Sequence, residues 1–261
     1  MKKALLVGID KYENSSMNFD DGCSNDVKNM TEVLITYYGF RQEDITVLLN
    51  EFAKKQIIMN KLENMVVNSK EGDHLAFFHS SHGSVVRDVN GDEKDRWDEV
   101  ICPHDMNWDK GIYILDDELN NVFMKSPTGV SMTAFFDTCF AGGLTKEGTI
   151  NNSSKFIIPP DFNFFNNKKA KIHKMASNVV NPLFAAFSAC SQNQTSTFCN
   201  IGGVQNSVFT YYLCHQIRLA TGDITKIKLI NKTKANIKKD RYKQTPRLEC
   251  DNKKKRTNLF S

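Results

Sequence analysis

Short apolar runs and longer stretches with helical spacing take turns along the chain. The apolar runs predict buried strands at 3–9, 45–48, 75–78, 132–136 and 182–187. Stretches with apolar residues every three or four positions predict helices at 24–38, 54–68, 116–124, 208–219 and 223–238. Residues 245–249 are typical of an edge strand, where Pro246 is tolerated. The succession of strands and helices predicts an α/β protein with a doubly wound, mostly parallel sheet.

Two segments depart from this pattern. Residues 84–111 are polar and too long for an ordinary connection, so we interpret them as functional. Residues 144–178 are rich in Asn, Lys and Pro, and we expect a long exposed loop there. We expect one domain over residues 1–250, followed by a basic tail at 251–261 that solvent surrounds. Nucleic-acid binding or nuclear import is the less favoured interpretation of that tail, and no specific nucleic-acid partner is expected.

The composition limits the class of protein and the cellular compartment that we expect. The chain has 261 residues, of which 40% are hydrophobic, enough for a sizeable core, and a formal charge of +4. Its seven cysteines are odd in number and form no CxxC pair, which argues against a disulfide framework or a structural zinc site. We therefore expect a reducing, cytoplasmic location. The first apolar run ends at Asp10 without a cleavage site and is typical of a strand rather than a signal peptide. No apolar stretch approaches the length of a membrane span, so no membrane partner is expected.

Two polar motifs each follow an apolar run, His79–Ser84 and Asp137–Gly143. Loops that leave the carboxyl ends of parallel strands line the binding crevice of such sheets. Cys139 and His82 would meet there, and a cysteine nucleophile needs an imidazole to take its proton. A buried structural cysteine is the alternative, which the glycines after both residues make less favoured. A zinc site at His79 and His82 is disfavoured, because residues three apart at a strand end face different ways.

These residues resemble the metacaspases and their prokaryotic relatives, the caspase-like cysteine peptidases. The resemblance covers about residues 3–142 and 183–219. The segments that carry it, in chain order, are Leu6–Tyr12, Gly22–Val27, His79–Ser84, Gly91–Glu99, Pro103–Asp105, Leu115–Leu119, Asp137–Cys139 and Ser188–Ser196. The chain departs from the family pattern at Ser81, where Gly is usual, and at Phe140-Ala141, which replace His-Ser. Each motif alone is weak, but all of them in order make a chance match improbable.

The resemblance implies a caspase-like α/β/α sandwich and a cysteine endopeptidase that cleaves after Arg or Lys. Its catalytic pair would be His82 and Cys139. The backbone N–H groups of Gly83 and Cys139 would bind the oxyanion. Family members are often monomers, and the same is expected here.

The resemblance also implies an acidic S1 pocket, the pocket for the residue before the cleaved bond. Its residues on this chain would be Cys23, Asp26, Ser80 and Asp137. Two carboxylates suit a guanidinium, which accepts bidentate pairing, and also accept an ammonium. Asp26 could instead be an ordinary acid in the first turn of a helix, and Asp137 a strand-end acid bonded to loop amides.

Acidic residues concentrate in segment 88–118, including Asp88, Asp92, Glu93, Asp95, Asp98 and Glu99. Such a cluster needs solvent or a hard cation such as calcium. The resemblance places calcium ligands at Asp98, Asp116 and Asp117. Lys146 stands where a fourth family acid is expected, and a solvated acidic face is the alternative.

Family members often cut themselves in the region that corresponds to 144–178. The basic residues available there are Lys146, Lys155, Lys168, Lys169, Lys171 and Lys174. We expect autoprocessing after one of them. A catalytically silent scaffold or regulator is the second hypothesis, supported by Ser81 and Phe140-Ala141. An unrelated hydrolase or thiol-dependent transferase on a similar sheet is the third.

Overall fold

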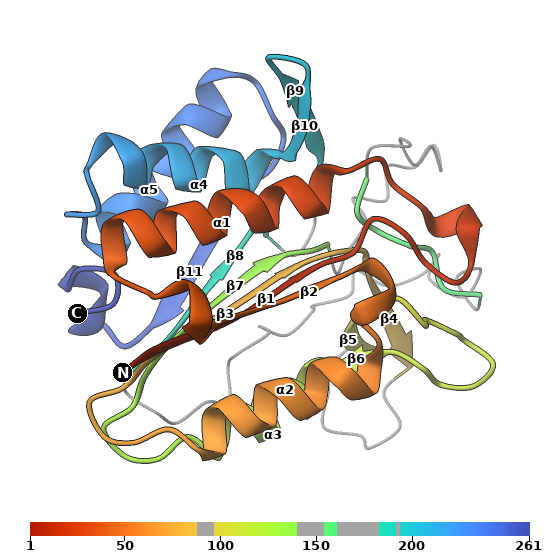
Figure 1. Cartoon of the computed structure of the whole chain (residues 1–261). Coiled ribbons are helices and arrows are strands. Elements are labelled where there is room, and N and C mark those ends of the chain that lie inside the picture. The colour runs from red at the N-terminus through yellow and green to blue at the C-terminus, as the bar shows by residue number, and fades with distance from the viewer. Residues whose placement is uncertain (88–96, 140–153, 161–182, 192–193) are drawn as a thin grey trace.

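A six-stranded sheet lies between two layers of helices in the computed structural model, which describes residues 1–87, 97–139, 154–160, 183–191 and 194–261 (Figure 1). The strand order is β11-β8-β7-β3-β1-β2. In chain order the strands are β1 (Lys2–Gly8), β2 (Ile45–Leu49), β3 (His74–Ser80), β7 (Ser131–Asp137), β8 (Phe184–Ser188) and β11 (Arg247–Cys250). The first five are parallel to their neighbours, and β11 pairs antiparallel with β8 at one edge. The predicted fold class is therefore confirmed.

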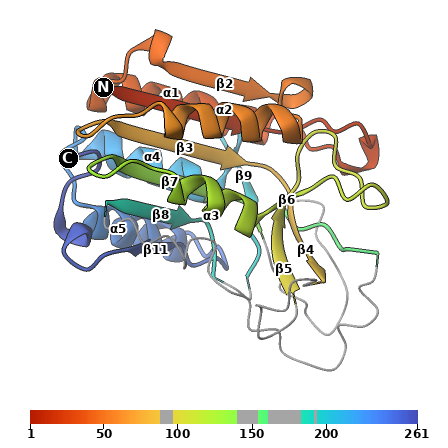
Figure 2. The same cartoon turned by 90° about the horizontal axis from the view of Figure 1, so that it is seen from below.

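The helices cover both faces of the sheet (Figure 2). One layer contains α1 (Gly22–Tyr38), α4 (Val208–Leu219) and α5 (Lys226–Lys239). The other contains α2 (Lys55–Val67) and α3 (Asp116–Met124). Because successive side chains of a strand point to opposite faces, Leu5 and Val7 enter the core under α2 and α3, whereas Ala4 and Leu6 enter the other. This is why the strands are apolar throughout their length.

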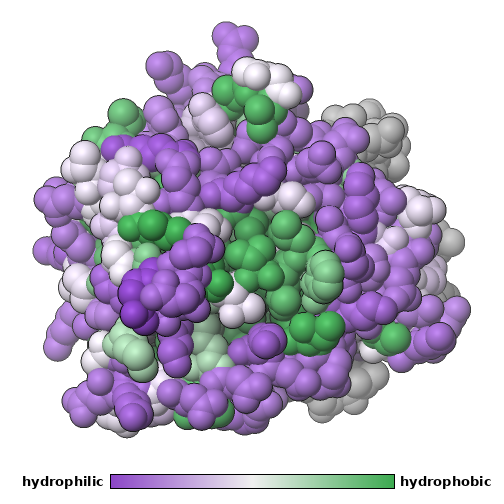
Figure 3. All heavy atoms as spheres, viewed as in Figure 1, coloured by the Kyte–Doolittle hydropathy of each residue, from purple (hydrophilic) through white to green (hydrophobic). Residues whose placement is uncertain are grey.

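The strand β2 forms the open edge of the sheet between the two helix layers. Figure 3, in the same orientation as Figure 1, shows a group of apolar residues at the surface near the centre of the view, where this edge lies. Val47 of β2 is 38% exposed there. The apolar character of the sheet thus continues to the surface at this edge.

Two smaller sheets lie outside the predicted pattern. One contains β4 (Gly83–Arg87), β5 (Trp97–Ile101) and β6 (Ile114–Leu115), paired antiparallel. The other is a hairpin of β9 (Phe198–Ile201) and β10 (Val204–Ser207), whose turn residues Gly202 and Gly203 have φ of 62° and 81°. Residues 84–111 are therefore not one irregular connection but contain two strands. Short 3-10 helices lie at Ser15–Met17, Gln42–Asp44, Asn50–Phe52 and Lys254–Arg256.

The helix α1 begins at Gly22, two residues before its predicted start, because a remote side chain caps it. The carboxylate of Asp10, just after β1, accepts the N–H groups of Cys23 and Ser24 at 2.7 and 2.8 Å. Those N–H groups have no partner within the helix, so the cap stabilises its first turn. Asp10 thereby fixes the start of α1 against the end of β1.

The residues that follow the basic run at 253–256 pack against the rest of the protein and do not form a solvated tail. Leu259 and Phe260 are buried, and the Phe260 ring lies 5.1–5.2 Å from the rings of Tyr38 and Phe40. The expectation for 251–261 was wrong because it weighed the lysines and not the two apolar residues that follow them. No helix in the described ranges is both long and apolar enough to cross a membrane.

We expect Phe260→Ala to lower the free energy of unfolding by about 3 kcal/mol, since it removes a buried ring from three aromatic contacts. Urea unfolding of the full chain measures this. Lys253→Ala, at an exposed position in the same segment, should change stability by less than about 0.5 kcal/mol. Equal effects of the two substitutions would contradict the packing of the C-terminal residues.

Candidate active site

The neighbouring strands β3 and β7 bring the two predicted catalytic residues to the same edge of the sheet. Ser80 and Asp137 are paired in register at the ends of these strands, and His82 and Cys139 each follow two residues later. The backbones also touch beyond the strands, since a Cβ on Gly83 would lie 2.4 Å from the carbonyl oxygen of Cys139. Only glycine allows this approach, which explains the Gly after His82.

Cys139 and His82 are both buried, and each has a defined partner. The thiol of Cys139 donates to the carbonyl of Gln194 at 3.2 Å. The Nε2 of His82 lies 2.8 Å from the carbonyl oxygen of Met17, so Nε2 carries the proton and Nδ1 is the basic nitrogen. The imidazole also packs against the ring of Phe19, with centroids 3.7 Å apart.

Burial lowers the pKa of His82 to about 3, and the ammonium of Lys155 acts in the same direction. The carbonyl groups of Met17 and Lys155 oppose this decrease. The imidazole is therefore neutral at pH 7, which is the form that accepts a proton from a thiol.

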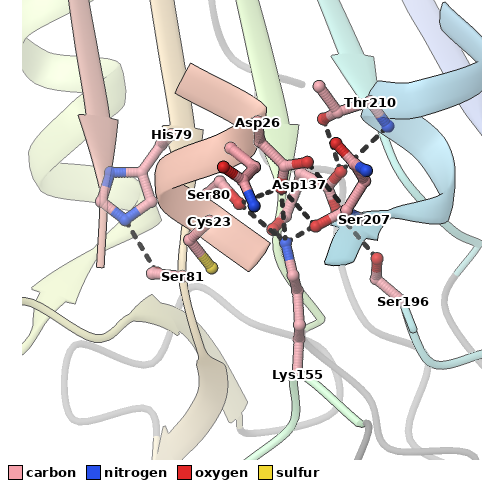
Figure 4. Close-up of polar contacts among 12 residues, drawn as sticks. Cys23, Asp26, His79, Ser80, Ser81, Asp137, Lys155, Ser196, Ser207 and Thr210 are labelled. Atoms are coloured by element: carbon pink, nitrogen blue, oxygen red, sulfur yellow. Dashed lines mark hydrogen bonds and ion pairs between the residues drawn. The ribbon is translucent and has the colours of Figure 1, made fainter. Parts of the chain in front are cut away.

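The four predicted S1 residues surround one ammonium group, that of Lys155 (Figure 4). Cys23 and Asp26 come from the first turns of α1, Ser80 from the end of β3 and Asp137 from the end of β7. The Nζ of Lys155 lies 2.8 Å from Ser80 Oγ, 2.8 Å from the carbonyl oxygen of Asp137 and 3.1 Å from its Oδ1. Asp26 Oδ2 is 3.6 Å away.

Three hydroxyl groups that the sequence did not indicate hold the two carboxylates in place. Asp137 accepts from Ser196 Oγ at 2.7 Å, and from Thr210 Oγ1 and N at 2.6 and 3.1 Å. Asp26 accepts from the N–H of Ser207 at 2.9 Å and from its hydroxyl. Ser207 and Thr210 stand at the N-terminus of α4, where backbone donors and the helix dipole favour anions. A Ser and a Thr three residues apart at a predicted helix start were the only hint.

The burial of Asp26 and Lys155 shifts the pKa values of both groups. Burial raises the pKa of Asp26 to about 7; the ammonium of Lys155 opposes this, and the carboxylate of Asp137 adds to it. Burial by itself would lower the pKa of Lys155, but the carboxylates of Asp137 and Asp26 raise it above its usual value. Lys155 is therefore charged although its side chain is fully buried.

Isolated β-bridges and backbone hydrogen bonds hold the main chain on both sides of Lys155. Its carbonyl oxygen accepts the N–H of Gly83 at 2.8 Å, and its own N–H donates to Ser196 at 3.1 Å. The N–H of Ile157 donates to the carbonyl of Gly83 at 3.0 Å, and Ser154 bridges to Thr197. The expected exposed loop at 144–178 is thus wrong for residues 154–156, which are buried. The prediction failed because residues 154–156 pair with Gly83 and with Ser196 and Thr197, and the local sequence does not encode such distant pairing.

A cleft of about 720 Å³ lies beside this segment. Its lining includes Met17, Phe19, His82, Phe156 and Phe198. A bound peptide would reach the imidazole through this cleft.

The expected calcium ligands lie in the small antiparallel sheet and the helix that follows it. Asp98 is on β5, Asp116 and Asp117 open α3, and Asp98 and Asp116 are each about 5% exposed. Among the described residues, no three His, Cys, Asp or Glu side chains lie close enough together to hold a metal ion. Lys146 and the acids at 88–96 lie outside the described residues. The described side chains do not by themselves fit a calcium site.

Comparison with known proteins agrees with this geometry. A family model described as "Metacaspase, peptidase C14 domain" matches residues 2–146. Metacaspase-1 of Schizosaccharomyces pombe is 28% identical over 95% of this chain and 67% of its own length. Metacaspase-1 of Meyerozyma guilliermondii is 35% identical over 54% of this chain and 35% of its own length. The chain thus spans between about a third and two thirds of these relatives.

Solved structures show the same fold. A Geobacter sulfurreducens protein superposes with a TM-score of 0.74 at 21% identity, over 100% of this chain and 98% of its own. Caspase-1 from Spodoptera frugiperda gives a TM-score of 0.61 at 18% identity, over 95% and 86%. The chain therefore has the caspase-like fold. More narrowly, the chain belongs to the metacaspase family, as its motifs predicted.

The buried histidines make stability depend on pH. Burial also lowers the pKa of His79 to about 3, while an unfolded histidine titrates near 6.5. A depressed pKa contributes stability that is present above pH 6.5 and is lost as the pH falls toward 3. Between pH 7.5 and 4.5 we expect His79 alone to account for a loss of about 2–3 kcal/mol.

Urea unfolding of the full chain at both pH values checks this. His79→Gln should reduce the loss, whereas Val47→Ala, on the exposed strand β2, should lower stability equally at both. A loss that His79→Gln leaves unchanged would contradict the assignment.

Proposed function

We propose that this chain is a cysteine endopeptidase that cleaves peptide bonds after Lys or Arg, with His82 and Cys139 as its catalytic pair. The observation that carries the proposal is the binding of Lys155. Its ammonium lies between two carboxylates while its carbonyl accepts the N–H of Gly83. An internal residue thus has the side-chain and backbone contacts that a substrate residue before the cleaved bond would need.

The proposed reaction assigns a role to each of these residues. Nδ1 of His82 takes the proton of the Cys139 thiol, and the sulfur attacks the substrate carbonyl carbon. The N–H of Gly83, with that of Cys139, stabilises the negative oxygen that forms. The C–N bond then breaks, and His82 returns the proton to the leaving amine. Water attacks the thioester next and regenerates the thiol.

The charge of the pocket selects the substrate. A Lys side chain would replace the ammonium of Lys155, and the planar guanidinium of Arg would pair with a carboxylate through two hydrogen bonds. An acidic side chain would meet Asp26 and Asp137, and repulsion between like buried charges would exclude it. The pocket therefore favours basic over acidic substrates.

Fluorogenic peptides that end in Lys, Arg or Asp before the reporter group test this activity. We expect hydrolysis of the Lys and Arg peptides only, and a loss of several orders of magnitude in Cys139→Ala and His82→Ala. Asp26→Asn should lower kcat/KM for basic peptides on the order of 100-fold, because a buried charge partner is removed.

Asp109→Asn is the matched control, since Asp109 is an exposed acid outside the lining of this cleft. It should leave kcat/KM nearly unchanged, and circular dichroism confirms that each variant is folded. Cleavage of the Asp peptide alone would refute the pocket assignment. A folded protein inactive on all peptides and on its own chain would favour a silent scaffold.

We also propose that the chain cuts itself after Lys155. The Lys155 carbonyl is already hydrogen-bonded to Gly83, and the residue that follows, Phe156, lines the cleft that contains His82. While Lys155 occupies the pocket, another basic side chain has no room there. Cleavage between Lys155 and Phe156 would let the segment leave and open the pocket.

Mass spectrometry of the incubated protein identifies the cut. We expect a fragment that ends at Lys155 and a new N-terminus at Phe156, both missing in Cys139→Ala. Lys155→Ala should abolish this pair of fragments, and Lys155→Arg should retain it. Lys174→Ala, another lysine of the expected loop, serves as the control. The same fragments in Lys155→Ala would disprove the proposal.

Calcium stimulation, a monomeric state and a cytoplasmic location remain proposals that rest on the family resemblance and on cysteine usage. Asp98, Asp116 and Asp117 would contribute to calcium binding only together with ligands beyond the described residues. Repeating the peptide assay with calcium and with a chelator decides the first point.

A further inference from the structure

A second cysteine, Cys190, lies beyond the end of β8, the strand next to the one that leads to Cys139. β7 and β8 are parallel neighbours, with Phe136 opposite Ser188, and the N–H of Ala189 donates to the carbonyl of Phe136 at 2.9 Å. Cys139 and Cys190 each lie two residues beyond the last residue of their strand, Asp137 or Ser188. The thiol of Cys190 donates to the carbonyl oxygen of Thr138, the residue before Cys139, at 3.8 Å.

We propose that Cys190 is a resolving cysteine, which forms a disulfide with Cys139 when a peroxide oxidises the nucleophile. In the first step the sulfur of Cys139 attacks the peroxide, the O–O bond breaks, and a sulfenic acid and water form from hydrogen peroxide. In the second step the sulfur of Cys190 attacks the sulfenic sulfur, an S–S bond forms, and a second water leaves. One peroxide thus takes two electrons from the two thiols.

The geometry favours this pair over other pairs of cysteines. Neighbouring strands lie about 5 Å apart, which is close to the Cα separation that a disulfide needs. Cys102 and Cys214 are fully buried in the hydrophobic cores on opposite faces of the sheet, and Cys250 lies on the edge strand β11. Cys23 is buried in the acidic pocket. Cys190 is partly exposed, and its sulfur lies against the backbone of the residue that precedes Cys139.

The environment also sets the order of the two steps. The proximity of Cys139, together with partial burial, raises the pKa of Cys190 well above its usual value. Cys190 therefore stays a thiol, while Cys139 has His82 at the same edge of the sheet to take its proton. The thiolate is the form that a peroxide oxidises, so Cys139 reacts first and Cys190 second.

The disulfide would have two consequences. It removes the nucleophile in a form that thiol reductants restore, and it prevents further oxidation of Cys139 to the irreversible sulfinic acid. The loss of activity rests on the proposed function, but the cross-link itself does not.

The test uses the full-length reduced chain, treated with hydrogen peroxide and then alkylated. In the wild type we expect two of the seven cysteines to escape alkylation, and a peptide map to link Cys139 to Cys190. Dithiothreitol should restore all seven. Hydrolysis of the basic peptides should fall with the cross-link and return with dithiothreitol.

Cys190→Ser and Cys190→Ala provide the decisive comparison. In both, peroxide should convert Cys139 to sulfinic acid, and dithiothreitol should no longer restore activity or alkylation. Cys250→Ser, which changes another partly exposed cysteine, should behave like the wild type. Sulfinic acid at Cys139 in the wild type, a link to a different cysteine, or full recovery of the Cys190 variants would overturn the proposal. If the cross-link forms but no peptide is ever cleaved, only the proposed function fails.

Discussion

A single buried ammonium group organises the site. Lys155 brings a full charge into the interior, where an unpaired charge would cost several kcal/mol. Asp137 and Asp26 compensate it, and hydroxyls from Ser196, Ser207 and Thr210 complete the network. Removing one member would leave its partners buried and unpaired. This network joins the segment at 154–157, the helix α1 and the start of α4.

The sheet order supplies the chemistry next to this network. β3, β7 and β8 are consecutive neighbours, so His82, Cys139 and Cys190 follow three adjacent strand ends. One strand end provides a base, the next a nucleophile and the third a second thiol. The acidic pocket lies at the same edge, because α1 and α4 begin there. The proposed catalytic pair, the acidic pocket and the second thiol thus all lie at one edge of the sheet.

The pattern of hydrophobic residues predicted the long elements well and the short ones poorly. The helix at 208–219 has the predicted bounds, and the strands of the main sheet shift by no more than a few residues. β4, β5, β9 and β10 were missed, because short antiparallel strands with polar residues lack a continuous apolar run. The burial of Phe260 was missed because the basic residues at 253–256 suggested that the whole segment lies in solvent.

The sequence by itself determined the family, the fold class, the candidate pair His82 and Cys139, and the acids Asp26 and Asp137. Each of these residues belongs to a local motif beside a strand or a helix start. Such motifs can be recognised in the amino-acid sequence without knowledge of the fold. Only the tertiary structure decided that Lys155 fills the acidic pocket, that the start of α4 holds its carboxylates, and that Cys190 lies against the backbone next to Cys139. These contacts join segments far apart in the chain, and which segments meet depends on the packing of the whole sheet and its helices.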